Sequence, residues 1–229
     1  LALYNDTLET LKENIESSEG IGRKGLILQS IIKFKQICNH PAQYLGEDDY
    51  LAEDSGKFEL LKELCMNIAS LRERVLVFTQ FKEITTYLDD YLADIFGKRG
   101  LTLTGSTQIK KRKELVDLFQ SDQYIPYMII TVKAGGVGLN LTNANHVIHF
   151  DRWWNPAVEN QATDRAFRIG QVKNVMVYKF ITKNTVEEKI DDMIMDKVKV
   201  AEALIGDNSE AIIMNMSNQE IIDLFKLER

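Results

Sequence analysis

The sequence predicts an α/β fold in which a parallel β-sheet carries helices on both faces. Between residues 55 and 184, short apolar runs alternate with segments in which apolar residues recur at helical spacing. The runs are continuous rather than alternating with polar residues, which is typical of strands buried on both faces. Because helical segments separate the runs, the connections fit crossovers between parallel strands.

Five apolar runs are the expected strands. They lie at residues 75–78, 101–104, 128–130, 147–150 and 175–181. Helices are expected around them at residues 55–68, 81–95, 107–120 and 156–170, and Ser55 is placed to cap the first of these. Parallel sheets bind ligands in the loops after the carboxyl ends of the strands. We therefore expect functional residues in the loops after Phe78, Ile130 and Phe150.

Helices without strands are expected at both ends of the chain. One helix runs to about residue 15, Gly20 and Gly22 break the pattern, and a second helix covers residues 26–38 before Pro41. Residues 185–188 and 217–220 have the capping-box form that opens a helix. The expected division is a helical lead-in at 1–54, an α/β lobe at 55–184 and a helical extension at 185–229.

Composition sets limits on the class of protein. The chain has 229 residues, of which 45% are hydrophobic and 27% charged, an ordinary globular balance. No apolar run approaches the ~18 residues that span a bilayer, and no signal peptide is present, so no membrane partner is expected. Cys38 and Cys65 fit neither a metal site nor a disulfide framework, and a reducing, cytoplasmic setting is the default. Because the first residue is Leu1 rather than Met, we expect a piece of a longer protein.

Charge alone does not settle whether nucleic acid binds. The net charge of −6 argues against phosphate contacts, which need Lys and Arg. The distribution is uneven, with a basic run at residues 110–113 and an acidic stretch at 47–54. A local basic face remains compatible with the net count, although a solvated surface explains either run equally simply.

The loop after Ile130 is rich in glycine. Gly135, Gly136 and Gly138 allow the backbone to approach a ligand closely, and exposed N–H groups there suit phosphate. Thr131 and Lys133 add a hydroxyl and a cation. A tight turn explains the glycines equally well.

Residues 161–171 carry two arginines at helical spacing. Arg165 and Arg168 are three residues apart and Gln161 is four before Arg165, so a helix would place all three on one face. Two guanidiniums and an amide that converge on one point suit a transferring phosphoryl group. A surface helix with two solvated arginines is an even alternative.

Three further segments have simpler explanations. Thr79 and Gln80 follow a predicted strand and precede a helix, where they either hold a nucleic-acid phosphate or cap the helix. Trp153 and Trp154 point in different directions, so one is expected in the core and the other at an interface. His40 has no partner for metal or nucleophilic chemistry, and we expect a structural role.

Taken in order, these motifs resemble the C-terminal lobe of Swi/Snf-type ATPases in helicase superfamily two. The matching stretches are residues 37–41, 55–57, 75–81, 133–141, 154–156, 161–171 and 185–188. The resemblance covers almost the whole chain, and the ordered set is specific although each motif alone is weak. The lack of large insertions and the ending at residues 224–227 look like the compact prokaryotic branch.

The resemblance implies a RecA-like lobe that closes over ATP held by a partner lobe. By motif position, Arg165 and Arg168 would be arginine fingers, assisted by Gln161. The loop at 135–138 would couple the nucleotide to DNA, and the nucleotide-binding positions would be Gly136, Gly138, Asn140 and Asp164. The double-stranded DNA backbone would be contacted by Thr79, Gln80, Thr131, Lys133 and Trp154, without sequence specificity.

The same resemblance assigns ATP and Mg²⁺ mainly to the other lobe of the full-length protein. The sequence has no GxxxxGK[ST] phosphate loop and no acidic magnesium box after a strand. The chain alone is therefore expected to be inactive. The family usually has histidine where Phe167 stands, and Arg152 occupies a variable position with no assigned role.

Three alternatives stay open at this point. The lobe could belong to a strand-separating helicase rather than a duplex translocase. It could also be an ATPase-dead regulatory DNA-binding module, although Gln161, Arg165 and Arg168 argue against that reading. A flavodoxin-like nucleotide-binding domain would need a phosphate loop after the first strand, where this chain has Thr79 and Gln80 without glycine.

Overall fold

The computed structural model describes residues 1–131, 139–153, 155–166, 174–201 and 209–228. The chain divides into two compact units. One is continuous and comprises Gly56–Phe180, whereas the other combines Leu1–Ser55 with Ile181–Arg229. The helical lead-in and the C-terminal extension thus belong to the same unit.

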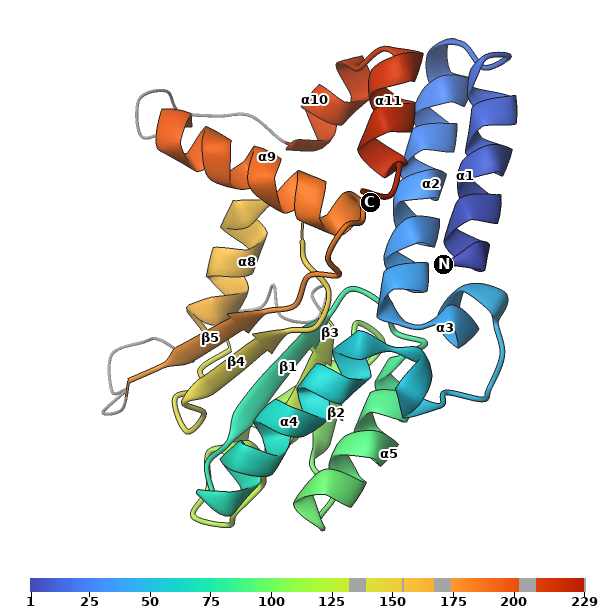
Figure 1. Cartoon of the computed structure of the whole chain (residues 1–229). Coiled ribbons are helices and arrows are strands. Elements are labelled where there is room, and N and C mark those ends of the chain that lie inside the picture. The colour runs from blue at the N-terminus through green and yellow to red at the C-terminus, as the bar shows by residue number, and fades with distance from the viewer. Residues whose placement is uncertain (132–138, 154, 167–173, 202–208, 229) are drawn as a thin grey trace. The chain divides into compact units, whose positions relative to one another are not determined.

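The continuous unit is built on one parallel sheet of five strands in the order β2-β3-β1-β4-β5. The strands are β1 (Val75–Thr79), β2 (Leu101–Leu103), β3 (Tyr127–Thr131), β4 (His146–His149) and β5 (Met176–Lys179), as Figure 1 shows. All five predicted strands are confirmed, and so is the α/β fold class.

Strand burial explains the sequence pattern. Every residue of β1, β3 and β4 is buried, because β1 is central and pairs with both of the others. Val77, for example, lies between Ile129 of β3 and Ile148 of β4. By contrast, β5 is an edge strand, and Met176 there is 51% exposed.

Two pairs of helices cover the two faces of the sheet. On one face lie α4 (Gly56–Ser70) and α5 (Thr85–Phe96): Phe58 of α4 meets the ring of Phe150 edge-on, and the Tyr127 hydroxyl of β3 donates to Asp89 of α5. On the other lie α6 (Ile109–Phe119) and α8 (Pro156–Thr163). Coverage of both faces confirms the predicted layering.

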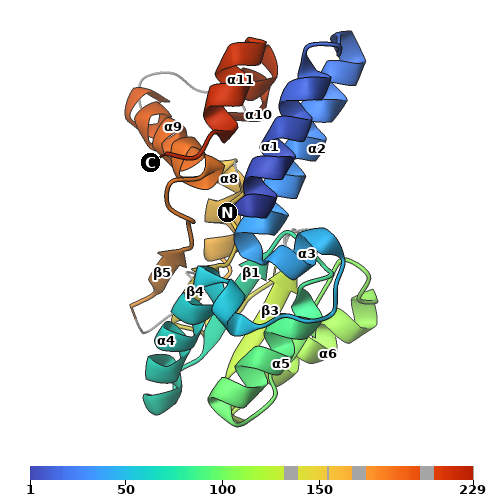
Figure 2. The ribbon, with the colours of Figure 1, turned by 45° about the vertical axis from the view of Figure 1, so that its right-hand side comes forward.

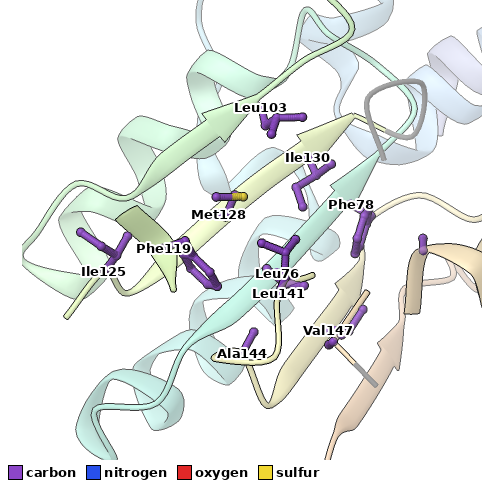
Figure 3. Packing of buried hydrophobic residues seen from close by; sticks show 12 residues of the cluster. Leu76, Phe78, Leu103, Phe119, Ile125, Met128, Ile130, Leu141, Ala144 and Val147 are labelled. Carbon is purple, nitrogen blue, oxygen red and sulfur yellow. The ribbon is translucent and has the colours of Figure 1, made fainter. Parts of the chain in front are cut away.

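The core between the sheet and the pair α6 and α8 is a single apolar cluster (Figure 3). Side chains from four strands point into it together with Phe119 of α6 and Ala162 of α8. The strand residues are Leu76, Phe78, Leu103, Met128, Ile130 and Val147. Burial of this much apolar area is the main stabilising contribution to the unit.

The discontinuous unit is helical (Figure 2). It contains α1 (Ala2–Ile15), α2 (Gly20–Asn39), α3 (Pro41–Leu45), a 3₁₀ turn (Ala52–Asp54), α9 (Val186–Ala201), α10 (Ser209–Asn215) and α11 (Asn218–Phe225). Aromatic rings join its two halves: the ring of Phe34 lies 4.5 Å from that of Tyr4 and 4.6 Å from that of Phe225.

The start of α2 corrects one prediction, since the helix begins at Gly20 rather than near residue 26. Gly20 itself has φ +54, the left-handed region that glycine tolerates, and Gly22 lies within the helix. The guanidinium of Arg23 donates to the carbonyl oxygens of Met214 and Met216 and to Asn218. These tertiary bonds stabilise a first turn that the glycines disfavour.

Of the two predicted capping boxes, the one before α11 is formed in full and the one before α9 has a different hydrogen bond. At α11, Ser217 and Glu220 form the full capping box that was predicted. At α9, the Thr185 hydroxyl accepts from the N–H of Glu187 rather than from the third helical residue. Both residues still mark where a helix begins.

His40 is a structural residue within its unit. Its Nδ1 accepts from the N–H of Ala42 and so caps α3, while Nε2 lies 2.8 Å from the carbonyl oxygen of Leu51. Its ring also stacks on Tyr50 at 4.6 Å. These contacts within its own unit agree with the expected structural role.

Candidate functional site

The carboxyl ends of β1, β3 and β4 meet at one edge of the sheet. In the strand register Thr79 lies beside Thr131, and Phe78 lies beside both Ile130 and His149. We call this end of the sheet, marked by Thr79, Thr131 and His149, the carboxyl edge. Parallel topology therefore brings together loops that are far apart in sequence, as ligand sites in such sheets require.

Asp151 organises the end of β1. Its carboxylate accepts from the Thr79 hydroxyl and, at 2.8 Å, from the N–H of Gln80. The Gln80 side-chain amide donates to the carbonyl oxygen of Arg152 at 2.6 Å. Thr79 is fully buried, so contact of its hydroxyl with DNA would require exchange of the bond to Asp151. Gln80 is only half-buried.

Thr131 is also held within the chain. It is 4% exposed, and its hydroxyl accepts from the N–H of Gly105 at 3.1 Å, which ties the loop after β2 to the end of β3. The predicted residues that follow it, Lys133, Gly136 and Gly138, lie outside the described residues.

Asn155 caps α8 at its start. Its side-chain oxygen accepts from the N–H of Ala157 at 3.0 Å, and Pro156 occupies the first helical position, where its missing N–H costs nothing. The predicted start at Pro156 is confirmed. Trp154, just before the cap, lies outside the described residues.

The end of α8 corrects a second prediction. The helix ends at Thr163, not near residue 170. The N–H groups of Arg165 and Ala166 donate to carbonyl oxygens three residues back instead of four, which tightens the chain into a turn. Arg165 therefore sits in a turn after the helix, and the helical-face argument for it does not hold.

Exposure separates the predicted phosphate residues further. Gln161 is exposed on α8 and Asp164 is exposed at its C-cap, whereas Arg165 is only 3% exposed. Gln161 and Arg165 do not form the shared surface that their spacing predicted. Arg168 lies outside the described residues.

A backbone bond brings two predicted nucleotide segments together. The N–H of Leu141 donates to the carbonyl oxygen of Arg165 at 2.9 Å. The exposed residues Asn140 and Asp164 stand next to these two in sequence, so the bond holds their two segments side by side. The contact between these two segments was not predicted, because they lie more than twenty residues apart in the sequence.

A buried charge network supports α8. The Arg152 guanidinium forms a two-point contact with the Glu159 carboxylate, with Nε to Oε1 at 2.6 Å and Nη2 to Oε2 at 3.0 Å. The N–H of Trp153 donates to the same carboxylate at 3.0 Å, and the Lys179 ammonium lies 3.1 Å away. Arg152 is 5% exposed and Glu159 is 1% exposed.

Sequence reasoning assigned no role to Arg152 or Glu159. An acid in the first turn of a helix is ordinarily a solvated partner of the helix dipole, and nothing marked Glu159 as buried. The sequence did contain one indication that this helix face is buried. Ala162 lies three residues after Glu159 on the same face, and small residues of this kind often pack against a sheet.

The pKa values of Glu159 in α8 and of His149 in β4 both lie below their ordinary values, for different reasons. Burial acts to raise the pKa of Glu159, but hydrogen bonds and charge from Arg152, with the charge of Lys179, hold the pKa below its ordinary value. Burial lowers the pKa of His149 from 6.5 to about 4, although nearby Glu159 opposes this. Near neutral pH, Glu159 is therefore ionised and His149 neutral.

We expect His149 to make the chain less stable in acid. In the folded chain the pKa of His149 is about 4, below the ordinary value of 6.5, so the unfolded state takes up the proton at a higher pH than the folded state does. The contribution of His149 to stability is therefore fully present above about pH 6.5 and is lost as the pH falls toward 4. Between about pH 7 and about pH 5 this loss is about 2 kcal/mol in the free energy of unfolding. Urea unfolding at both pH values, with His149→Gln as the comparison, measures it. The same pH dependence in parent and variant would contradict the assignment.

Two negative findings apply to the part of the chain that the structure describes. There, no group of three or more His, Cys, Asp or Glu side chains is arranged to hold a metal ion. In the same residues, no helix combines the length and apolar character needed to cross a bilayer.

Comparison with known proteins shows the family. Residues 56–170 match the family described as helicase conserved C-terminal domain. A putative ATP-dependent helicase/translocase of Bacillus subtilis, YwqA, is 46% identical over 99% of this chain and 24% of its own length. A solved structure decides the branch of helicases, because the SWI2/SNF2 ATPase C-terminal domain of Sulfolobus solfataricus matches the whole of this chain. The chain belongs to the Swi/Snf-type ATPases. As the C-terminal RecA-like lobe of that family, it has the fold that the resemblance implied.

A eukaryotic relative shares less identity with this chain. The ISWI chromatin-remodeling complex ATPase ISW2 of Saccharomyces cerevisiae is 32% identical over 94% of this chain and 20% of its own length. The higher identity of the Bacillus protein agrees with the expected prokaryotic branch. This chain therefore spans a quarter or less of the length of these two curated relatives.

Two solved SWI2/SNF2 structures match this chain over its whole length. The SWI2/SNF2 ATPase C-terminal domain of Sulfolobus solfataricus matches with a TM-score of 0.83 and 33% identity, covering all of this chain and 93% of that one. The ATPase core of the same organism in complex with double-stranded DNA matches with a TM-score of 0.87 and 36% identity, covering all of this chain and 47% of that one.

Proposed function

We propose that this chain is the second motor lobe of an ATP-dependent translocase that moves along double-stranded DNA and remodels protein–DNA complexes. The observation that carries this proposal is the likeness over the whole chain to the Sulfolobus ATPase core in complex with double-stranded DNA. One relative is named a helicase/translocase and another a chromatin-remodeling ATPase, which supports the same activity. The activity belongs to the longer protein, in the cytoplasm and at the nucleoid of a prokaryote.

The turn after α8 is the proposed source of catalytic charge. Arg165 and Arg168 would act as arginine fingers, whose guanidiniums stabilise the charge that develops on the transferring phosphoryl group. Gln161 would assist at the phosphates. Because Arg165 is 3% exposed, its guanidinium must be uncovered when the lobes close. The bond from Leu141 to its carbonyl oxygen supplies a fixed backbone anchor for that movement.

The segments that contain Asn140 and Asp164 are the proposed nucleotide-binding part of this lobe. The Asn140 amide and the backbone N–H groups at Gly136 and Gly138 would donate to the phosphates. The Asp164 carboxylate has the same sign of charge as phosphate, so in the proposal it faces the nucleoside rather than the phosphates. No described acidic cluster is arranged for a cation. In the proposal ATP therefore meets this lobe through its phosphates, while Mg²⁺, which neutralises phosphate charge, is held by the first RecA-like lobe.

The carboxyl edge is the proposed DNA-facing side. Gln80 and Lys133 would contact backbone phosphates directly, and Thr79 and Thr131 would shape the edge through the hydrogen bonds that hold them. Trp154 would transmit lobe closure to DNA movement. A net charge of −6 is compatible with this because only one edge needs a local positive potential.

Two assays on the full-length protein separate translocation from strand separation. A duplex translocase displaces the third strand of a triplex in an ATP-dependent manner without unwinding a forked duplex. ATP turnover should rise with double-stranded DNA more than with single-stranded DNA. ATP-dependent unwinding of the fork would instead assign a strand-separating helicase, and no turnover with any DNA would assign a regulatory module.

Lys133→Ala in the full-length protein is expected to weaken DNA binding and to flatten its salt dependence. Loss of one phosphate contact reduces the slope of log K against log [salt] by about 0.9 on duplex DNA. Binding isotherms over a salt series measure the slope. The matched control is Lys98→Ala, which removes the same charge from the loop before β2, at the opposite edge of the sheet. An unchanged slope for Lys133→Ala, or an equal change in both variants, would contradict backbone contact by Lys133.

A further inference from the structure

The carboxylate of Glu159 gathers donors from two separate segments. Arg152 and Trp153 approach it from the loop between β4 and α8, and Lys179 approaches it from the end of β5. The carboxylate belongs to a residue that is 1% exposed, and its principal partner Arg152 is 5% exposed. The Arg152–Glu159 contact therefore fixes the first turn of α8 against the sheet, and both of its side chains are covered.

The same loop is bonded to the end of β1. The carbonyl oxygen of Arg152 accepts from the Gln80 side chain, and the carboxylate of Asp151 accepts from the Gln80 N–H and the Thr79 hydroxyl. A continuous set of polar contacts therefore runs from Gln80, through Arg152, to Glu159. It begins at the proposed DNA-facing side and ends inside α8.

The far end of α8 is fixed as well. The Thr163 hydroxyl lies 3.0 Å from Nε2 of His149 on β4, and Ala162 is buried against the sheet. Because α8 has only eight residues and is held at both ends, a displacement of its first turn moves the helix as a whole. Arg165 follows its last residue by two positions.

Stability alone does not explain a charged pair at this site. Desolvation of two buried ions offsets much of their attraction, and well-packed apolar side chains of the same size are commonly as stable or more so. A two-point guanidinium–carboxylate contact does supply a defined geometry between the parts that it joins. Geometry, rather than stability, is what the Arg152–Glu159 pair contributes.

We propose that Arg152 and Glu159 are a positioning pair that links the DNA-facing end of β1 to the arginine-bearing turn after α8. DNA engaged at Gln80 shifts the loop at Arg152, and Glu159 carries that shift through α8 to Arg165. The pair rests on the proposed motor function and touches neither DNA nor nucleotide itself. It is a route by which DNA contact sets the position of a catalytic arginine.

The test is Glu159→Gln in the full-length protein, which keeps the shape of the side chain and removes its charge. At saturating ATP and duplex DNA, kcat should fall by roughly tenfold to a hundredfold, the range for small misplacement of a catalytic group. The KM for ATP and the Kd for DNA should each stay within about threefold, because no contact to either ligand is removed. Turnover is measured well below the melting temperature of each variant.

A second substitution tests whether the two residues act together. Arg152→Lys keeps the positive charge and loses the two-point contact, so kcat should fall in the same way. The double variant should lose no more than about twofold beyond the larger single effect, since both changes break one link. If the losses in kcat of the two single variants multiply in the double variant, the two residues do not act as a pair. If Glu159→Gln does not fold, Arg152→Lys alone tests the positioning role.

The matched control is Glu73→Gln, which breaks another carboxylate contact of the same sheet. Glu73 lies 2.6 Å from Nε2 of His146 at the amino end of β4, away from the carboxyl edge. The kcat of the Glu73→Gln variant should stay within about twofold of the parent value, even if the melting temperature of the variant is lower. Parental kcat in Glu159→Gln, or an equal loss in Glu73→Gln, would overturn the positioning role.

Arg165→Ala separates failure of the pair from failure of the motor function. If Arg165→Ala abolishes turnover and Glu159→Gln does not, the positioning pair alone is wrong. If Arg165→Ala keeps full turnover, the proposed arginine finger is wrong and the pair has no catalytic group to position.

Discussion

An Arg165→Ala variant of the full-length protein is expected to hydrolyse ATP roughly a thousandfold more slowly than the parent, the range for loss of an arginine finger. The reason is electrostatic: a guanidinium near the transferring phosphoryl group stabilises charge that appears only in the transition state. The structure places Arg165 in a turn whose backbone is held by the N–H of Leu141. The substitution keeps the carbonyl oxygen of residue 165, so the backbone bond from Leu141 to this turn should remain.

Steady-state turnover with and without duplex DNA measures this effect. ATP binding should change little, so the loss should appear in kcat rather than in KM. Arg168→Ala, outside the described residues, is expected to behave in the same way. Arg99→Ala is the control, since Arg99 is exposed and pairs with Asp89 and Asp90 in the region before β2. Retained turnover in Arg165→Ala would remove this residue from the catalytic role.

The isolated 229-residue chain is expected to hydrolyse ATP at less than about a thousandth of the rate of the full-length protein. Its sequence contains no GxxxxGK[ST] loop to hold the β- and γ-phosphates and no magnesium box. Arginines that stabilise a transition state cannot act when nothing else binds the nucleotide and its metal ion. Phosphate release at high protein concentration, with and without duplex DNA, measures the residual rate.

The control for residual activity is the same chain with Arg165→Ala. Turnover that survives this substitution comes from a contaminating ATPase, because the proposed site would have lost its catalytic charge. Robust DNA-stimulated turnover that disappears in the variant would show that one lobe suffices. That outcome would reject the division of labour between two lobes.

Strand positions were predictable because burial on both faces leaves a direct trace in the sequence. The central strands β1, β3 and β4 are wholly buried, and each appears as a run of apolar residues. Clustering of Thr79 and Thr131 also followed from topology, since carboxyl ends of neighbouring parallel strands must meet.

Side-chain roles within the site were less predictable. The spacing of Gln161 and Arg165 fits a helix, but whether the helix continues depends on tertiary contacts such as the bond from Leu141 to the Arg165 carbonyl oxygen. Burial of Arg152 and Glu159 was likewise invisible, because opposite charges seven residues apart resemble an ordinary surface. Periodicity reports which face is apolar and gives no information on which polar residues are covered.

The discontinuous helical unit has a consequence for synthesis on the ribosome. Gly56–Phe180 can fold as soon as it emerges, since all five of its strands are then present. Helices α1 and α2 are made before this unit, whereas Phe225, the aromatic partner of Phe34 in α2, is made after it. At about 5–20 residues per second, Phe34 waits roughly 10–40 seconds for that ring. During this interval the apolar faces of α1 and α2 stay exposed on the nascent chain. Within this lobe, the helices that precede the sheet therefore reach their native packing only after the sheet has formed, and they are the segment most in need of a chaperone.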